Sequence, residues 1–545
     1  MHSIEIVLTM LLLVIASGYV VRMLPFALPL PLVQIALGAG VAAVSDHGVV
    51  LDPGTFFLLF LPPLLFLDGW RIPKEGLFHD ARAILQLAFG LVVVTVVGIG
   101  FLVHWMIPAM PLAVAFALAA IVSPTDPVAL SSITARVPIP RRLMHVLEGE
   151  SLLNDASGLV CFRFAVAAAM TGHFSLVSAS LTFLWVALGG IALGALVAYG
   201  ISKLHVGITR RFGQDSGLPI LVSLLTPFGA YLAAEHLGAS GILAAVAAGI
   251  TTSYVELTGV ALASTRVQRA AVWDSVQFTL NGIAFVLLGE QLPGILAGAA
   301  ASVGQSGHLN PWWLLLYALA INVGLALLRL AWVWISLRMD RAAARRRGEK
   351  ASRPPWRLVV ATALAGVRGA ITLAGVLTLP LLMPDGSAFP ARDLAIFLAA
   401  AVVLLSLAAA SFGLPRLLVG LEMPPEPHHE REEYLARRSA AKAALAAIER
   451  KRQDLPAGDA DEAEILASAA TRVMALYQRR LGDGDTGIDA GRLRKADEAE
   501  RALRLAALRA ERSEIFALAR RHHLSDDLAR KLVREIDLVE SRYQS

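Results

Sequence analysis

Two neighbouring apolar segments of the sequence carry acidic and hydroxyl side chains at spacings that suit a small cation. The first contains the run Ser123-Pro124-Thr125-Asp126-Pro127. Two prolines remove backbone hydrogen-bond donors on either side of an acid, which predicts a break in a helix. Inside a membrane, broken helices line cavities and expose carbonyl groups that bind cations. The segment therefore predicts a cation site near Thr125 and Asp126.

The second segment contains the run ESLLND at residues 150–155. At 3.6 residues per turn, Ser151 lies one turn before Asp155 on one helix face, and Glu150 lies one turn before Asn154. The run offers hydroxyl, amide and carboxylate oxygens, which are the ligands that hard cations prefer. Burial disfavours the charged form of Asp155, so a proton and a cation would compete for this carboxylate.

Two arginines in later apolar segments are the matching buried cations. Arg329 lies within a continuous apolar run, and Arg368 directly precedes Gly369 and follows Gly366 by two residues. Arginine keeps its charge when buried, so each guanidinium needs an acidic partner or water. A glycine-loosened segment late in the chain and a proline-broken segment early in it are also what two inverted repeats would produce.

Four further charged residues lie in or beside apolar segments. Asp68 ends a proline-containing segment and is expected near a membrane surface. Glu235 and Glu290 lie near the outer ends predicted for their segments, where we expect a carboxylate to reach water. Arg163 lies in the outer half of its segment, and the sequence identifies no partner for it.

Composition places these segments in a membrane. The 545 residues are 56% hydrophobic and 17% charged, whereas soluble domains are about 45–50% apolar and about 25% charged. The first 422 residues hold 25 Lys and Arg with 20 Asp and Glu, and the last 123 hold 23 of each kind. The sequence therefore predicts a membrane domain at 1–422 with a soluble tail at 423–545, and excludes a purely cytosolic enzyme. The net charge of +5 gives no reason to expect a nucleic-acid partner.

Thirteen apolar segments approach the length of about 20 residues that a membrane-spanning helix needs. They lie at 4–22, 25–44, 55–70, 83–103, 108–133, 146–171, 176–202, 217–235, 239–254, 272–292, 312–337, 357–381 and 393–418, the third and ninth being short. The first segment shows no small-residue cleavage site, so we expect a retained helix in place of a signal peptide.

Basic residues fall almost entirely in the loops after odd-numbered segments. These loops contain Arg22, the basic residues within 71–82, 136–142, 203–211 and 266–269, the dense run at 338–357, and Arg416. The loops on the other side contain only Arg392. Basic loops stay in the cytoplasm, so the chain is expected in the cell membrane with its N-terminus outside and its C-terminus in the cytoplasm.

The last 123 residues begin with a proline-rich linker at 424–427. Four amphipathic helices rich in Ala, Leu, Glu and Arg are predicted beyond it, at 429–453, 460–481, 492–522 and 526–542. No glycine-rich phosphate-binding motif follows a strand pattern, and the single Cys161 builds neither an internal disulfide nor a cysteine zinc site. We therefore expect a regulatory or dimerising helical tail and no cofactor.

With these residues assembled, the chain resembles the monovalent cation–proton antiporters of the NhaP and eukaryotic sodium/proton exchanger type. The likeness covers nearly the whole membrane part and is carried by residues 123–129, 148–155 and 366–371, with weaker support from 62–66 and 238–244. Asp68 departs from the family pattern, because it falls one residue later than the family's usual acid after the two prolines.

The resemblance implies an all-α membrane fold of about thirteen helices with inverted repeats and two discontinuous helices. It also implies a homodimer with separate dimer and core domains. Asp155 would carry the cation and the proton, and the residues around it would be Asn154, Ser151, Thr125 and Asp126. Glu150 would form a structural ion pair with Arg329. Arg368 would lie beside the second helix break and neutralise helix dipoles or Asp126, and Asp68 would be an acid at the mouth of the pathway.

These observations predict a secondary antiporter that exchanges sodium for protons. By resemblance the exchange is electroneutral, because Asn154 stands where electrogenic relatives have a second acid. The ligand types leave lithium and potassium open, so potassium–proton exchange is the first alternative. A gated cation channel and an ion sensor that signals through the tail are alternatives of another class. The absence of a repeated Thr-Val-Gly-Tyr-Gly filter counts against the channel.

Overall fold

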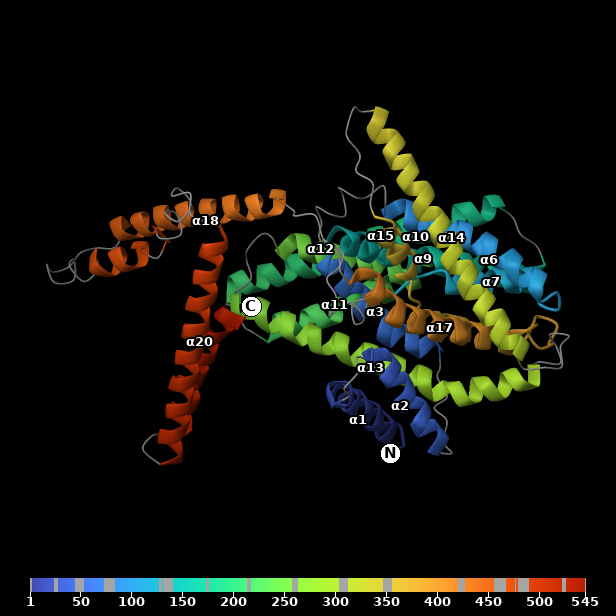
Figure 1. Cartoon of the computed structure of the whole chain (residues 1–545), viewed down its shortest axis with the longest axis horizontal. Coiled ribbons are helices and arrows are strands. Elements are labelled where there is room, and N and C mark those ends of the chain that lie inside the picture. The colour runs from blue at the N-terminus through green and yellow to red at the C-terminus, as the bar shows by residue number, and fades with distance from the viewer. Residues whose placement is uncertain are drawn as a thin grey trace. The chain divides into compact units, whose positions relative to one another are not determined.

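The computed structural model describes residues 2–23, 28–44, 53–72, 84–126, 130, 141–172, 176–212, 217–256, 263–302, 312–346, 355–419, 427–454, 467–475, 477–478, 490–521 and 526–544. These residues are almost entirely helical (Figure 1), and the only β pairing among them is one bridge between Leu382 and Ala388. The predicted all-α fold is therefore confirmed. The chain divides into two compact units, Met1–Glu422 and Met423–Ser545.

Fifteen helical elements are described in the first unit. In chain order they are α1 (His2–Met23), α2 (Leu30–Val44), α3 (Pro53–Arg71), η1 (Gln86–Leu91, a π-helix), α6 (Val92–Met106), α7 (Leu112–Val122), α9 (Arg141–Thr171), α10 (Leu176–Phe212), α11 (Leu218–His236), α12 (Gly241–Glu256), α13 (Ala263–Ser302), α14 (Trp312–Arg346), α15 (Trp356–Leu364), α16 (Ala370–Leu377) and α17 (Arg392–Leu418).

Each of the thirteen predicted spans overlaps one or two of these helices. Among the described residues, eight helical segments are long and apolar enough to cross a membrane. The helices α2, α7 and α12 are apolar but shorter. The first unit therefore has the make-up of a multi-pass membrane domain, and the exact number of crossings stays a prediction.

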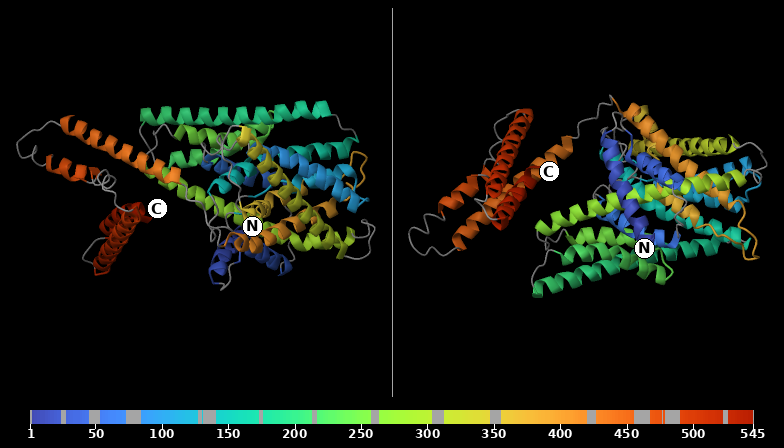
Figure 2. Two further views of the ribbon diagram at one scale, coloured as in Figure 1. Left: turned by 45° about the horizontal axis from the view of Figure 1, so that its top comes forward. Right: turned by 90° about the horizontal axis from the view of Figure 1, so that it is seen from below.

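The helices of the first unit pack in two groups. The first helix group consists of α1, α2, α3 and α10 to α13: both α3 and α10 pack on α12, and α13 packs on α2. The second helix group consists of η1, α6, α7, α9 and α14 to α17: α7 packs between α6 and α9, and α17 packs on α14, α15 and α16. Figure 2 shows long helices of the unit running side by side across it. The groups meet where α3 contacts α9 and α16, and where α13 contacts α16 and α17.

Small residues explain the close contact between α10 and α12. Gly190 and Gly194 lie four residues apart on α10. A methyl group at Gly190 would meet the backbone of Ser240, directly before α12, and one at Gly194 would meet the backbone of Ala244 in α12. Membrane helices approach closely through such small residues, because lipid gives no hydrophobic force that drives helices together. These contacts fix the framework against which the second helix group is placed.

Two non-helical stretches of backbone in the second group, here called interruptions, contact each other. The first follows the end of α7 at Val122 and runs over 123–126, and the second, at 365–369, separates α15 from α16. The backbone N–H of Asp126 donates a hydrogen bond to the carbonyl of Val367, with an N–O distance of 2.7 Å. Pro124 lacks a backbone donor, which explains the first interruption. Of the residues that follow the first interruption, 127–129 and 131–140 lie outside the described residues.

The second unit is helical as predicted. Its helices are α18 (Pro427–Asp454), a short helix at 467–475, α20 (Ala490–Arg520) and α21 (Asp526–Gln544). The last two pack together, and the Arg512 guanidinium pairs with Glu540 and lies 2.9 Å from Asp537. Residues 460–466 and 479–481 of the second predicted tail helix lie outside the described residues.

Candidate functional site

A cavity of about 40 Å³ lies where the two helix groups meet. Its walls come from α3 and α13 of the first group, and from residues 124–126, α9 and residues 369–372 of the second. The polar residues in this lining are Asp68, Thr125, Asp126, Asp155, Asn281 and Thr372. A single water molecule needs roughly 10–15 Å³ of such space. The cavity therefore has room for a small cation that keeps some of its water.

Asp155 lies on α9 and faces this cavity. Its side chain is only 8% exposed, and it also lines a second, smaller cavity that reaches Leu159 and Ile242. Among the described residues, none donates a hydrogen bond to its carboxylate. A buried carboxylate without donors is costly when charged, and it is relieved by a proton or a bound cation.

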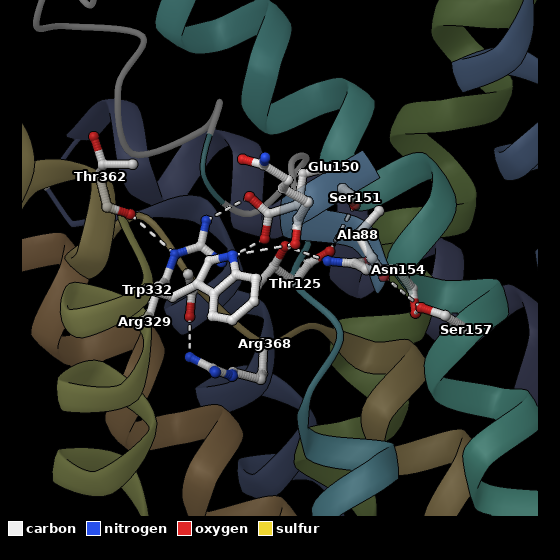
Figure 3. Close-up of polar contacts among 12 residues, drawn as sticks. Ala88, Thr125, Glu150, Ser151, Asn154, Ser157, Arg329, Trp332, Thr362 and Arg368 are labelled. Carbon is white, nitrogen blue, oxygen red and sulfur yellow. Dashed lines mark hydrogen bonds and ion pairs between the residues drawn. The ribbon is translucent and has the colours of Figure 1, made fainter. Parts of the chain in front are cut away.

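Ser151 and Asn154 hold the broken backbone against α9. The Ser151 hydroxyl donates to the backbone carbonyl of Thr125 at 2.6 Å, and the Asn154 amide donates to the Thr125 hydroxyl at 2.9 Å. Both residues are buried, and Figure 3 shows both side chains pointing toward Thr125. The five residues predicted as a cation site are thus brought together. Thr125, Asp126 and Asp155 line the cavity, while Ser151 and Asn154 position Thr125.

A π-helical turn braces α9 just beyond Asp155. The Ser157 hydroxyl donates to the carbonyl of Ala88 in η1 at 2.7 Å, and Trp332 of α14 donates to the carbonyl of Gln86 at 3.1 Å (Figure 3). π-Turns are rare and occur often at functional sites. The sequence pattern does not reveal this turn, so Ser157 was missed as a residue that positions the site.

Glu150 and Arg329 form a buried ion pair between α9 and α14. Both residues are almost fully buried, with 1% and 2% of their surfaces exposed. Two guanidinium nitrogens contact the two carboxylate oxygens, one of them at 2.6 Å, and Nε of Arg329 donates to the carbonyl of Thr362 on α15 at 3.0 Å (Figure 3). Such paired contacts from a planar guanidinium are among the strongest charge-assisted hydrogen bonds.

Arg368 lies at the second interruption and donates to carbonyls at the end of α7 and in the non-helical backbone after α15. Its Nε donates to the carbonyl of Val122, the last residue of α7, at 3.0 Å, and its Nη1 donates to the carbonyl of Gly366. Its backbone N–H donates to the Ser406 hydroxyl on α17 at 3.1 Å. Helix C-termini carry partial negative charge, so the guanidinium stabilises the end of α7.

Asp68 lies near the end of α3 and lines the cavity on the side of the first helix group. Two contacts fix this end of the helix. Nε1 of Trp70 donates to Glu256 on α12 at 2.9 Å, and Arg71 pairs with Asp274 on α13. Glu256 also pairs with the buried Arg269. These contacts fix the end of α3 and, with it, the position of Asp68 in the wall of the cavity.

The remaining charged residues have partners that the sequence did not identify. Arg163 on α9 lies 3.7 Å from Glu235 on α11, so this pair joins the two helix groups. Glu235 also accepts a hydrogen bond from the N–H of Gly241 at the start of α12, at 3.1 Å. The expectation that Glu290 reaches water is wrong, because Glu290 is buried. The backbone of α13 at Glu290 runs so close to α2 that a methyl group at Gly38 would meet it, and α2 covers this region.

The arrangement of these side chains is suited to binding and releasing a small ion. Among the residues that the structure describes, no group of three or more His, Cys, Asp or Glu could hold a metal ion as a resident cofactor. What the cavity provides instead is a buried carboxylate next to other oxygens, between two groups of helices. Such a site suits a transported monovalent cation or a proton.

Comparison with known proteins identifies the family. The sequence model of the family described as "Sodium/hydrogen exchanger, transmembrane" matches residues 7–420. The chain belongs to this family. The resemblance found in the sequence is therefore confirmed, and the family is one of transporters and not of enzymes.

Two relatives match almost the whole chain of this exchanger. It is 41% identical over 540 residues to the Escherichia coli K12 protein named "Uncharacterized Na(+)/H(+) exchanger YjcE", covering 98% of each chain. It is 37% identical over 546 residues to the "Sodium, potassium, lithium and rubidium/H(+) antiporter" of Bacillus subtilis 168, covering 99% of this chain and 78% of the relative.

The fold of the exchanger matches a solved structure. The sodium proton antiporter MjNhaP1 from Methanocaldococcus jannaschii at pH 8 superposes with a TM-score of 0.54 at 17% identity, covering 77% of this chain and 99% of that chain. At this identity the match establishes the fold alone.

Proposed function

We propose that this exchanger is a secondary active antiporter that trades sodium, lithium or potassium for protons, with Asp155 as the shared carrier of cation and proton. The observation that carries the proposal is the Asp155 carboxylate, which lines a cavity between two helix groups without a described hydrogen-bond donor. Relatives named as antiporters of sodium, potassium, lithium, rubidium and protons support the choice of substrates.

The coupling follows from the cost of a bare charge. A carboxylate that holds a proton or a cation is neutral, whereas an empty carboxylate is charged and costly to move through the bilayer interior. The second helix group therefore exposes Asp155 to the other side of the membrane only when this carboxylate holds a proton or a cation. Each crossing in one direction with a cation requires a return with a proton, and no ATP is needed.

An amide in place of a second acid beside Asp155 favours electroneutral exchange. The residue before Asp155 is Asn154, an amide that stays neutral and binds Thr125. With one carboxylate loaded by one proton or one cation, the exchange ratio is one to one. Asp126 and Thr125 then serve as further oxygens in the lining, and Ser151 and Asn154 set their position.

The other charged residues have structural and access roles in this proposal. The ion pair of Glu150 with Arg329 holds α9 against α14 and α15. Arg368, at the second interruption, stabilises the end of α7. Asp68, in the wall of the first helix group, attracts cations at the mouth of the pathway.

We place the exchanger in the cell membrane with its N-terminus outside and its C-terminus in the cytoplasm, as the basic loops indicate. We further propose a homodimer that contributes to pH homeostasis, with residues 423–545 as a regulatory or dimerising tail. Membrane lipid is a further partner in this proposal.

Transport measurements separate this function from its alternatives. Purified protein in liposomes should carry out saturable cation flux driven by a pH gradient, read out by a pH-sensitive dye with sodium, lithium and potassium tested in parallel. Exchange with potassium alone would favour the potassium–proton alternative. Cation flux that does not depend on the pH gradient would favour a channel. The absence of any flux would favour a sensor.

The Asp155→Asn variant tests the carrier. It should abolish exchange and keep the melting temperature and the elution profile of the wild type, because Asn is a close isostere that cannot hold a proton or pair with a cation. Asp385→Asn, which changes an exposed acid in the loop before α17, is the matched control and should exchange normally. Near wild-type exchange by folded Asp155→Asn would show that the carrier is another group.

A further inference from the structure

Asn281 is a polar residue that the roles described so far leave without a function. It lies on α13 in the apolar stretch before Phe285, and it lines the same cavity as Asp155 from the opposite helix group. Within the part of the chain that the structure describes, it is the one carboxamide in this lining, and it makes no hydrogen bond there. The side chain of Asn281 is only partly buried, so its amide opens on the cavity and is available to a ligand there.

Two other asparagines of the membrane unit show how amides are normally accommodated. Asn322 on α14 donates to the carbonyl of Ala318 on its own helix at 3.0 Å. Asn154 donates to the Thr125 hydroxyl. Each of these amides makes a structural hydrogen bond, whereas the Asn281 amide faces a space large enough for a partly hydrated cation.

The second helix group lines the cavity with the side-chain oxygens of Thr125, Asp126, Asp155 and Thr372. The Ser151 hydroxyl and the amide nitrogen of Asn154 are directed at Thr125, so they do not add to the cavity lining. A hard cation prefers several oxygen ligands, and amide oxygens are among the usual ones. A proton needs a single oxygen. The cation and the proton therefore differ in the number of oxygen ligands that they need at this site.

We propose that Asn281 is a cation ligand, contributed by the first helix group, that determines which monovalent cation the exchanger prefers. The inference rests on the proposed function and adds a ligand from the other side of the cavity. Asn281 completes the oxygen set around the cation while the cavity is closed, and it makes no contribution to proton binding at Asp155. The size of the gap between Asn281 and Asp155 then discriminates between sodium and the larger potassium.

The test compares Asn281→Ala with Asn322→Ala, which removes a partly buried amide on α14 that bonds its own helix. Exchange in liposomes is measured with sodium, lithium and potassium at several pH values. Asn281→Ala should raise the Michaelis constant for sodium about tenfold, as expected for one lost ligand. Its maximal rate and its proton competition constant should stay at wild-type values, while its ratio of sodium to potassium Michaelis constants changes. Asn322→Ala should match the wild type.

Asn281→Gln provides a conservative variant. It keeps the amide oxygen on a longer side chain, so it should recover part of the sodium affinity and shift the preference among the three cations. Binding of radioactive sodium to detergent-solubilised wild type, Asn281→Ala and Asn322→Ala measures affinity without transport.

Two outcomes would overturn the inference. One is an Asn281→Ala variant with wild-type sodium affinity and cation preference. The other is a variant that loses maximal rate, sodium affinity and proton competition together, because that pattern indicates a structural residue. The proposed function is tested separately, since it fails when the wild type does not exchange or when Asp155→Asn does.

Discussion

Among single residues, the buried Glu150 and Arg329 show best how charge is tolerated inside this protein. Their pair is fully removed from water, and its guanidinium also bonds the Thr362 carbonyl. The pair thereby connects three helices: α9, α14 and α15. Desolvation cancels much of the attraction between buried ions, so the pair is more important for geometry than for net stability.

A double-mutant cycle tests this pair. Removing one partner leaves an uncompensated buried charge, which costs roughly 3–5 kcal/mol. Glu150→Ala and Arg329→Ala should each lower the melting temperature sharply, and the double variant should recover part of the loss. The measurement is thermal unfolding of the three detergent-solubilised variants and the wild type. Strictly additive losses would contradict a direct pairing.

Among the elements, the two interruptions, at 123–126 and 365–369, position Asp126 in the site. The interruptions share the hydrogen bond between Asp126 and Val367, and Arg368 bonds carbonyls at both of them. Gly369 is required at this contact, because a methyl group there would meet the Asp126 side chain. The position of Asp126 in the cavity thus depends on a close approach that a glycine permits.

The variant Gly369→Ala should therefore displace Asp126 and impair transport. We expect exchange to fall roughly tenfold or more, because small misplacements of a site group have large effects on rate. Gly200→Ala on α10 is the matched control, since a methyl group there meets nothing within 4 Å. The control should exchange normally and gain stability from the better helix propensity of alanine. Equal exchange by the two variants would show that the close approach is unimportant.

For the whole molecule, the open question is whether pH acts at the site or through the tail. If proton and sodium share Asp155, a fall in pH fills the carboxylate with protons and raises the apparent sodium Michaelis constant. A rise in pH leaves few protons for the return step. Activity should then be bell-shaped in pH, with both limbs belonging mainly to one coupled site.

Sodium kinetics at several pH values on the full chain and on a chain ended before Pro424 distinguish the two sources. With competition at Asp155, the shortened chain keeps the bell shape and the rise of the Michaelis constant at low pH. A regulatory tail would instead change the maximal rate. Loss of the pH dependence together with the tail would refute competition at the shared site.

The sequence alone determined the class of fold and the family. Long apolar segments in a chain with a charged tail are sufficient for a helical membrane protein, because unpaired backbone groups are not tolerated in lipid. The residue types around Thr125, Asp126 and Asp155 were also readable, since acids and broken helices inside a membrane are rare and costly. Helical spacing placed Ser151 and Asp155 on one face without any tertiary information.

Only the tertiary structure decided which side chains meet. Periodicity describes one helix at a time, so it could not show that Ser151 and Asn154 bind Thr125, that Arg163 reaches Glu235, or that α2 covers Glu290. It could not find Asn281 either, because its role depends on a cavity whose walls come from five chain segments far apart in sequence. Local patterns follow from backbone geometry, whereas the lining of a cavity follows from how helices pack, and that is fixed by contacts such as those at Gly190, Gly194 and Gly369.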